Sequence, residues 1–167
     1  LIGLASSGLH SNGYSLARKA LLEQGGLTVG ASGFTPGCTV GEEMLRPTRI
    51  YVRPVLALME QVRVMGMAHI TGGGLIENPP RMLPAGVSAR LKWGQWPVHP
   101  IFRLIQEVGN VDAGEMRRVF NMGIGFMVVV RPGDAQHAVE ILQANGEKAY
   151  VIGEIVPGDG RVVFEGA

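Results

Sequence analysis

The chain is poor in the features on which several classes of protein depend. Cys38 is the only cysteine among its 167 residues, so no internal disulfide can form, and a reducing compartment is expected. The 15 basic and 14 acidic residues are spread evenly, give a net charge of +1, and include no basic block or basic-aromatic stripe. We therefore expect neither nucleic acid nor an anionic membrane surface as a partner.

Long apolar runs are also missing. Residues 122–130 and 150–156 form the longest ones, and both are too short and too rich in glycine to span a membrane. Hydrophobic residues nevertheless make up 46% of the chain and charged residues 17%, which excludes a disordered chain. This composition indicates one well-buried α/β domain, or one that hides surface against a partner. The eight methionines are interpreted as core residues.

Several catalytic signatures are absent from the sequence. There is no G-x-x-x-x-G-K-S/T phosphate loop and no G-x-S-x-G nucleophile turn, and Gly123-Ile124-Gly125 lacks the third glycine of a dinucleotide-binding loop. The four histidines have no metal-ligand spacing, and one cysteine cannot make a thiolate site. We therefore expect no metal site in this chain.

The sequence does contain alternating strand and helix patterns. Strands are predicted at residues 1–5, 63–70, 87–91, 123–130, 149–156 and 161–164, helices at residues 14–24, 53–61, 75–82, 100–108, 113–120 and 134–144, and a loop at residues 27–41. Ser11 or Asn12, Asp112, and Asp134 are the predicted helix caps. Because Leu1 lies inside a predicted strand, we expect the chain to be the later part of a longer polypeptide.

A run of three glycines follows the strand that ends at His69. Thr71-Gly72-Gly73-Gly74 stands between that strand and a short predicted helix. Ordered glycines cost backbone entropy, so they indicate a positive φ or a close approach of the backbone to another group. Unpaired N–H groups at such a turn suit an anion. The turn is therefore either a phosphate site or a plain tight turn.

A second polar loop at residues 6–13 has the same arrangement of strand, glycine loop and helix start. We expect the N–H groups of the two loops to converge on one anion. His10 in this loop is either a surface or capping histidine or a group that binds phosphate or transfers a proton. His69 is either a core histidine or a second such group.

Five further polar residues leave their roles open. Glu77, Asn78 and Arg81 follow the glycine turn on a polar face, which a solvated helix surface explains equally well. Arg49, together with Arg46 on the other side of Pro47-Thr48, could contact phosphate. Residue chemistry alone therefore predicts an α/β domain with one or two anion-binding loops.

Five motifs taken together resemble a known family. They are residues 6–16, Pro47-Thr48-Arg49-Ile50-Tyr51, Ala68 to Gly74, Glu77-Asn78 with Pro80-Arg81, and residues 118–125. Their order and spacing closely resemble the C-terminal half of aminoimidazole ribonucleotide synthetase, the phosphoribosylformylglycinamidine cyclo-ligase (PurM) family of purine biosynthesis. Pro79 departs from the pattern by making a double proline.

The resemblance implies an α/β (α+β) fold, with a mixed β-sheet flanked by helices in three α/β/α layers and a partial ferredoxin-like topology. Residues 1–167 would form the single C-terminal domain. The N-terminal ATP-binding and dimerisation domain would lie outside this chain.

The resemblance also implies an activity. The family enzyme is a cytoplasmic homodimer that uses ATP to activate an amide oxygen of formylglycinamidine ribonucleotide. An internal nitrogen then closes the imidazole ring, and ADP and phosphate are released. ATP and Mg²⁺ would be bound mostly by the missing domain, so we expect residues 1–167 alone to be inactive.

The resemblance places both glycine loops at the substrate cleft. His10 and His69 are the implied catalytic residues, with unassigned roles in stabilising charge or moving a proton. The implied substrate or phosphate ligands are Ser7, Gly8, Ser11, Asn12, Gly13, Thr71, Gly72, Gly73, Gly74 and Asn78. The alternatives are another ATP-dependent phosphoryl-transfer enzyme of the same superfamily and a non-catalytic phosphate-binding or assembly domain.

Overall fold

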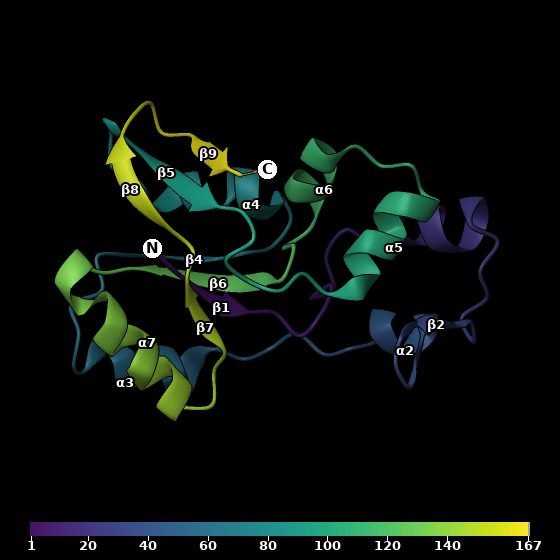
Figure 1. Ribbon diagram of the computed structural model, residues 1–167, viewed down its shortest axis with the longest axis horizontal. Helices are drawn as coiled ribbons and strands as arrows, with labels where there is room; N and C mark the ends of the chain where they lie inside the picture. The colour runs from purple at the N-terminus through teal and green to yellow at the C-terminus, as the bar shows by residue number, and fades with distance from the viewer. Residues whose placement is uncertain (167) are drawn as a thin grey trace.

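A four-stranded antiparallel sheet lies at the centre of the fold (Figure 1). The computed structural model describes residues 1–166, and its main sheet has the strand order β4-β6-β1-β7. The strands are β1 (Ile2–Ala5), β4 (Gly66–His69), β6 (Ile124–Val129) and β7 (Ala149–Val151). Gly3 of β1 pairs with Met127 of β6 and with Tyr150 of β7, and His69 of β4 pairs with Phe126 of β6.

Two helices connect these strands and cover one face of the sheet (Figure 1). α3 (Val52–Met59) joins β1 to β4, and α7 (Ala135–Ala144) joins β6 to β7. Ile2, Leu4 and Val128 pack in one core with Leu58 of α3 and Leu142 of α7. The strands of the main sheet and these two helices follow the order β1-α3-β4-β6-α7-β7, which is the ferredoxin-like pattern. Other elements are inserted between β1 and α3 and between β4 and β6, so the expected likeness is confirmed as a partial one.

The opposite face carries a smaller sheet and further helices. The elements are β5 (Val87–Lys92), β8 (Gly153–Pro157), β9 (Val162–Glu165), α4 (Gly74–Glu77), α5 (Pro100–Val108) and α6 (Ala113–Val119). β5 pairs antiparallel with β8 and parallel with β9, so the mixed pairing belongs to this sheet. Met127 of the main sheet packs in a second core with Leu91, Phe102 and Phe120. The predicted layered α/β arrangement is therefore confirmed, with a small sheet added to one outer layer.

The single strand predicted at residues 149–156 is wrong. The chain leaves the main sheet after β7 and enters the smaller sheet as β8, and the fully buried Ile152 lies at the change. A Cβ on Gly3 would lie 2.7 Å from Ile152 Cδ1, so the side chain of Ile152 packs closely on β1. Gly153 is the one local sign of this change, because the residues on both sides keep a strand composition.

The predicted helix at residues 14–24 is confirmed in extent but not in detail. α1 (Tyr14–Arg18) continues into a π-helical segment, η1 (Lys19–Gln24). The helix begins at Gly13, whose φ is 71°, and no side chain caps it. The predicted cap by Ser11 or Asn12 is therefore wrong. Asn12 instead donates from Nδ2 to the carbonyl of His10, at 2.7 Å.

The remaining elements are short. They are β2 (Ser32–Thr35) and β3 (Cys38–Thr39), which form a hairpin inside the predicted loop, α2 (Val40–Met44), and the 3-10 turns η2 (Pro79–Met82) and η3 (Pro132–Asp134). Asp112 caps α6 as predicted, since its Oδ1 accepts from the Gly114 N–H at 2.7 Å. Asp134 precedes α7 without such a bond. Within residues 1–166, no helix is long and apolar enough to cross a membrane.

Candidate functional site

Both glycine loops pack against the segment that follows α6. A Cβ on Gly13 would overlap the ring of Phe120, and a Cβ on Gly74 would overlap the backbone carbonyls of Arg117 and Phe120. Asn121 donates from Nδ2 to the carbonyl of Gly8 at 2.8 Å. The residues after α6 therefore hold the two loops in fixed positions, although the loops are far apart in the sequence.

The turn at residues 71–74 is closed by its own backbone and by Asn78. Gly73 and Gly74 have φ values of 98° and 54°, in the left-handed region that favours glycine. The N–H of Gly74 donates to the carbonyl of Thr71 at 3.0 Å, so this amide is used within the turn. The buried Asn78 places Nδ2 3.1, 3.2 and 2.9 Å from the carbonyls of Thr71, Gly72 and Gly74. The amide nitrogen of Asn78 therefore faces into the turn and fixes its shape.

Gly72 differs from its two neighbours. It is exposed, its φ is not positive, and a Cβ added to it would meet nothing within 4 Å. Within the described chain, the N–H groups of Gly72 and Gly73 have no hydrogen-bond partner. Neither backbone conformation nor packing requires glycine at position 72, whereas an approaching ligand would benefit from the bare backbone. The carboxylate of Glu77 lies beside Gly73, with Oε2 3.0 Å from where a Cβ would stand.

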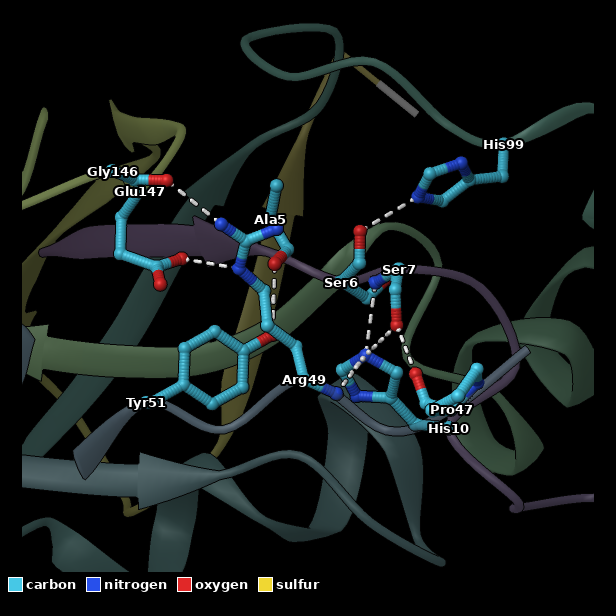
Figure 2. A network of polar contacts seen from close by, with 10 residues as sticks. All are labelled: Ala5, Ser6, Ser7, His10, Pro47, Arg49, Tyr51, His99, Gly146 and Glu147. Atoms are coloured by element: carbon cyan, nitrogen blue, oxygen red, sulfur yellow. Dashed lines mark hydrogen bonds and ion pairs between the residues drawn. The ribbon is translucent and has the colours of Figure 1, made fainter. Parts of the chain in front are cut away.

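His10 is enclosed by hydrogen-bond donors (Figure 2). It is only 2% exposed and has a φ of 54°. Its Nε2 accepts from the Ser7 N–H at 2.9 Å and lies 3.4 Å from the backbone nitrogen of Arg49. Because a backbone N–H can only donate, Nε2 is unprotonated and Nδ1 carries the proton. Nδ1 is buried without a partner in the described chain.

Burial lowers the pKa of His10 to about 4, and positive charge at His69, His99 and Arg49 acts in the same direction. The ring is therefore neutral near pH 7. It supports the loop as a hydrogen-bond acceptor and does not reach solvent. The interpretation of His10 as a surface histidine is wrong, and its catalytic role stays a prediction.

His69 has the opposite surroundings. It is exposed at the end of β4, stacks on Phe126 with ring centroids 6.1 Å apart, and meets the edge of Tyr51 at 6.4 Å. The interpretation of His69 as a core histidine is therefore wrong. The ring of Tyr51 is also 6.1 Å from that of His10, so one tyrosine lies near both predicted histidines.

Sequence reasoning missed Tyr51 and the ion pair beside it (Figure 2). The Tyr51 hydroxyl donates to the carbonyl of Ala5 at 2.8 Å, and burial raises the pKa of this phenol, so it stays protonated. Arg49 donates from Nε to Glu147 Oε2 at 2.6 Å and from Nη2 to the carbonyl of Gly146 at 2.8 Å. This guanidinium fastens the loop before α3 to the turn after α7. Nothing in the sequence indicates an ion pair between two residues that are 98 positions apart.

Hydrogen bonds from a side chain and to the backbone also hold the residue 6–13 loop against its neighbours. Ser7 donates from Oγ to the carbonyl of Pro47 at 2.6 Å, and His99 binds the carbonyl of Ser6 at 2.9 Å through Nε2. Ser11 is exposed and has a φ of 57°. Gly8 lies against the side chain of Arg46. Binding roles for these loop residues stay predictions.

Two hollows flank His69. One, of about 400 Å³, is lined mostly by apolar side chains of α3 and the preceding loop, among them Val52, Leu56 and Met59. The other, of about 450 Å³, lies beside the glycine turn and is lined by Thr71 and Arg81, among others. Among residues 1–166, no group of three or more His, Cys, Asp or Glu side chains could hold a metal ion.

Comparison with known proteins shows the family of this chain. The sequence matches the family described as AIR synthase related protein, C-terminal domain, over residues 1–165. It is 54% identical over 166 residues to a phosphoribosylformylglycinamidine cyclo-ligase of Bacillus mycoides (strain KBAB4), covering 99% of this chain and 48% of that protein. A cyclo-ligase of Shouchella clausii (strain KSM-K16) is 53% identical over 163 residues, covering 98% and 47%. The chain spans about half the length of the curated relatives it matches.

Solved structures with lower identity share the fold. Thiamine-monophosphate kinase from Stenotrophomonas maltophilia K279a has a TM-score of 0.60 and 17% identity, with 99% of this chain and 49% of that chain covered. E. coli HypE, a hydrogenase maturation protein, has a TM-score of 0.61 and 19% identity, with 99% and 46% covered. By its match along nearly the entire length, this chain belongs to the family of AIR synthase related proteins, C-terminal domain.

Proposed function

We propose that this chain is the C-terminal domain of a phosphoribosylformylglycinamidine cyclo-ligase and forms the substrate side of its active-site cleft. The observation that carries the proposal is the 53–54% identity to cyclo-ligases along 98–99% of the chain. The exposed His69 and the free N–H groups of Gly72 and Gly73 support it, because they lie on one side of the fold and suit a phosphorylated ligand.

The proposed reaction closes an imidazole ring. ATP phosphorylates the amide oxygen of formylglycinamidine ribonucleotide, an internal nitrogen attacks the activated carbon, and the C–O bond to phosphate breaks. Phosphoryl transfer depends mainly on positioning and on neutralising charge. In this chain, the N–H group of Gly72 would donate to a phosphate oxygen, and His69 would move a proton. His10 would keep the neighbouring loop in shape.

The rest of the enzyme would supply the remaining parts. ATP and Mg²⁺ are assigned to an N-terminal domain outside this chain, since the chain spans about half the length of the cyclo-ligases that it matches. Bound Mg²⁺ would neutralise charge on the phosphates. We further propose a homodimer in the cytoplasm, with the N-terminal domain making the dimer contact.

A second candidate is another ATP-dependent phosphoryl-transfer activity. The fold shared with thiamine-monophosphate kinase at a TM-score of 0.60 favours it as the alternative. A non-catalytic phosphate-binding or assembly domain is the third possibility, and the exposed apolar side chains of α3 favour it.

A product assay on the complete protein tests the proposal. The enzyme is incubated with formylglycinamidine ribonucleotide, ATP and Mg²⁺, and the products are separated by chromatography. We expect aminoimidazole ribonucleotide and ADP in equal amounts, and no product from residues 1–167 alone. ATP consumption with thiamine monophosphate and no ring closure would favour the alternative. Turnover by residues 1–167 alone would show that the cleft needs no second domain.

A further inference from the structure

The hollow of about 450 Å³ beside the glycine turn contains one permanently charged side chain. Its polar lining consists of His69, Thr71, Asn78 and Arg81, and Arg81 is the residue whose charge persists at every physiological pH. A hollow of this size is large enough for a sugar phosphate. The lining therefore combines the space for such a ligand with a positive charge.

Arg81 is not engaged in an ion pair within the described chain. The ion pairs of residues 1–166 use the arginines at positions 46, 49, 90, 118 and 161. A solvated arginine on a convex surface would need no explanation. Arg81 instead lines a concave surface together with Thr71, the residue that precedes the two turn amides without a partner.

The backbone that carries Arg81 is tied to the glycine turn. The Arg81 N–H donates to the carbonyl of Asn78 at 3.2 Å, while the side chain of Asn78 binds three carbonyls of the turn. Met82 packs against Gly66 of β4, with Sδ 3.6 Å from where a Cβ would stand. Asn78 therefore holds both the glycine turn and the backbone of Arg81 in place, so the guanidinium of Arg81 extends from a fixed backbone.

A carboxylate on the other side of the turn limits where an anion can lie. Glu77 stands beside Gly73, and its Oε1 is 3.9 Å from Arg118 Nε. Negative charge there would repel an anion placed over Gly73. The favourable position is therefore on the Arg81 side of the turn, near the N–H of Gly72 and near Thr71. The Thr71 hydroxyl donates to Asn78 Oδ1 at 3.3 Å and would turn from it to the anion.

We propose that Arg81, with the Thr71 hydroxyl and the Gly72 N–H, binds the phosphate monoester of a sugar-phosphate substrate in this hollow. The assignment rests on the proposed function and names the part of the site that holds the substrate's phosphate. A guanidinium matches two oxygens of a phosphate at once, which a lysine cannot do. The sugar would then extend toward His69 on the rim.

The test measures binding to the complete protein by calorimetry, without turnover. The ligands are ribose 5-phosphate, inorganic phosphate and ribose, and the variants are Arg81→Ala, Arg81→Lys and Glu77→Gln. Arg131→Ala is the matched control, because Arg131 is an exposed arginine beyond the far end of β6. We expect Arg81→Ala to weaken ribose 5-phosphate binding about 10- to 100-fold. Arg81→Lys should restore part of that loss, and Glu77→Gln should strengthen binding.

Three outcomes would overturn the assignment. Unchanged ribose 5-phosphate affinity in a folded Arg81→Ala variant is the first, and an equal loss in Arg131→Ala is the second. The third is binding of inorganic phosphate alone, since the hollow would then take a transferred or released phosphoryl group. If ring closure fails but ribose 5-phosphate binding depends on Arg81, the site stands and the proposed reaction falls. If ring closure occurs, Arg81→Ala should raise KM and leave kcat nearly unchanged.

Discussion

At the scale of single residues, His10 and His69 show that the same type of side chain behaves differently in buried and exposed surroundings. His10 accepts a backbone hydrogen bond in a buried position, and its ring is neutral near pH 7. His69 stacks on Phe126 with its ring open to solvent. Of the two, His69 is the histidine that a ligand can meet directly. His10 instead supports its loop by accepting a hydrogen bond from the Ser7 N–H.

The buried His10 predicts a pH dependence of stability. Its pKa is about 4 in the folded chain and about 6.5 when unfolded, so the unfolded chain binds the extra proton between these values. Stability should be complete above pH 6.5 and should fall as the pH drops toward 4, by on the order of 2 kcal/mol from this residue. Urea denaturation at several pH values measures the slope.

Matched variants assign that slope to His10. His10→Asn should flatten it, since asparagine tolerates the positive φ of 54° and does not titrate. His137→Asn removes an exposed histidine and should leave the slope unchanged. Equal slopes for His10→Asn and the parent chain would contradict the burial argument.

At the scale of elements, the local pattern predicted most of what formed. The predicted helix at residues 100–108 is α5 (Pro100–Val108), because an apolar face at helical spacing and a proline in the first turn are both local signals. Asp112 capped α6 for the same reason, since a cap depends on residues within one turn. Helices and caps that depend on residues close in the sequence could therefore be predicted from the sequence.

Features caused by distant residues could not be predicted. The change of sheet at Ile152 depends on packing against Gly3, and the start of α1 at Gly13 depends on the ring of Phe120. The site follows the same rule. The glycine turn was visible as a motif, but the exposure of His69 and the burial of His10 were set by the sheet register and by the loop around residue 49.

The ion pair between Arg49 and Glu147 links two such elements and can be tested. Glu147 is buried, whereas the side chain of Arg49 is 35% exposed, so Glu147→Gln would replace the buried charge of the pair by a neutral amide. We expect the free energy of unfolding to fall by about 2 kcal/mol. Chemical denaturation measures it, and Glu154→Gln serves as the control, because Arg90–Glu154 is an exposed pair.

The Glu154→Gln control shows whether the loss of stability comes from the burial of the Arg49–Glu147 pair or from the loss of any ion pair. Exposed pairs are screened by water, so Glu154→Gln should leave the denaturation midpoint unchanged. If both variants lose the same stability, the tie between the loop before α3 and the turn after α7 is no stronger than a surface contact.

At the scale of the whole molecule, an apolar face stands beside the candidate site. Ile50, Val52, Leu56, Met59 and Met67 are between 40% and 80% exposed, and they line the hollow of about 400 Å³. The interpretation of all methionines as core residues is wrong, since Met59, Met65 and Met67 lie at the surface. Contiguous apolar surface of this kind marks a contact in soluble proteins. A chain with about half the length of its relatives would expose such a contact.

This apolar face predicts that residues 1–167 self-associate when produced alone, because pairing two copies removes exposed Val52 and Leu56 from water. Sedimentation velocity over a range of concentrations should show a growing dimer. The double variant Val52→Glu, Leu56→Glu places two charges one helical turn apart on α3 and should stay monomeric with an unchanged Tm. Val163→Glu, at a comparably exposed position on β9, should dimerise like the parent chain. A parent chain that stays monomeric at every concentration would mean that this face is not adhesive on its own, and the contact would then depend on complementary shape in its partner rather than on apolar area.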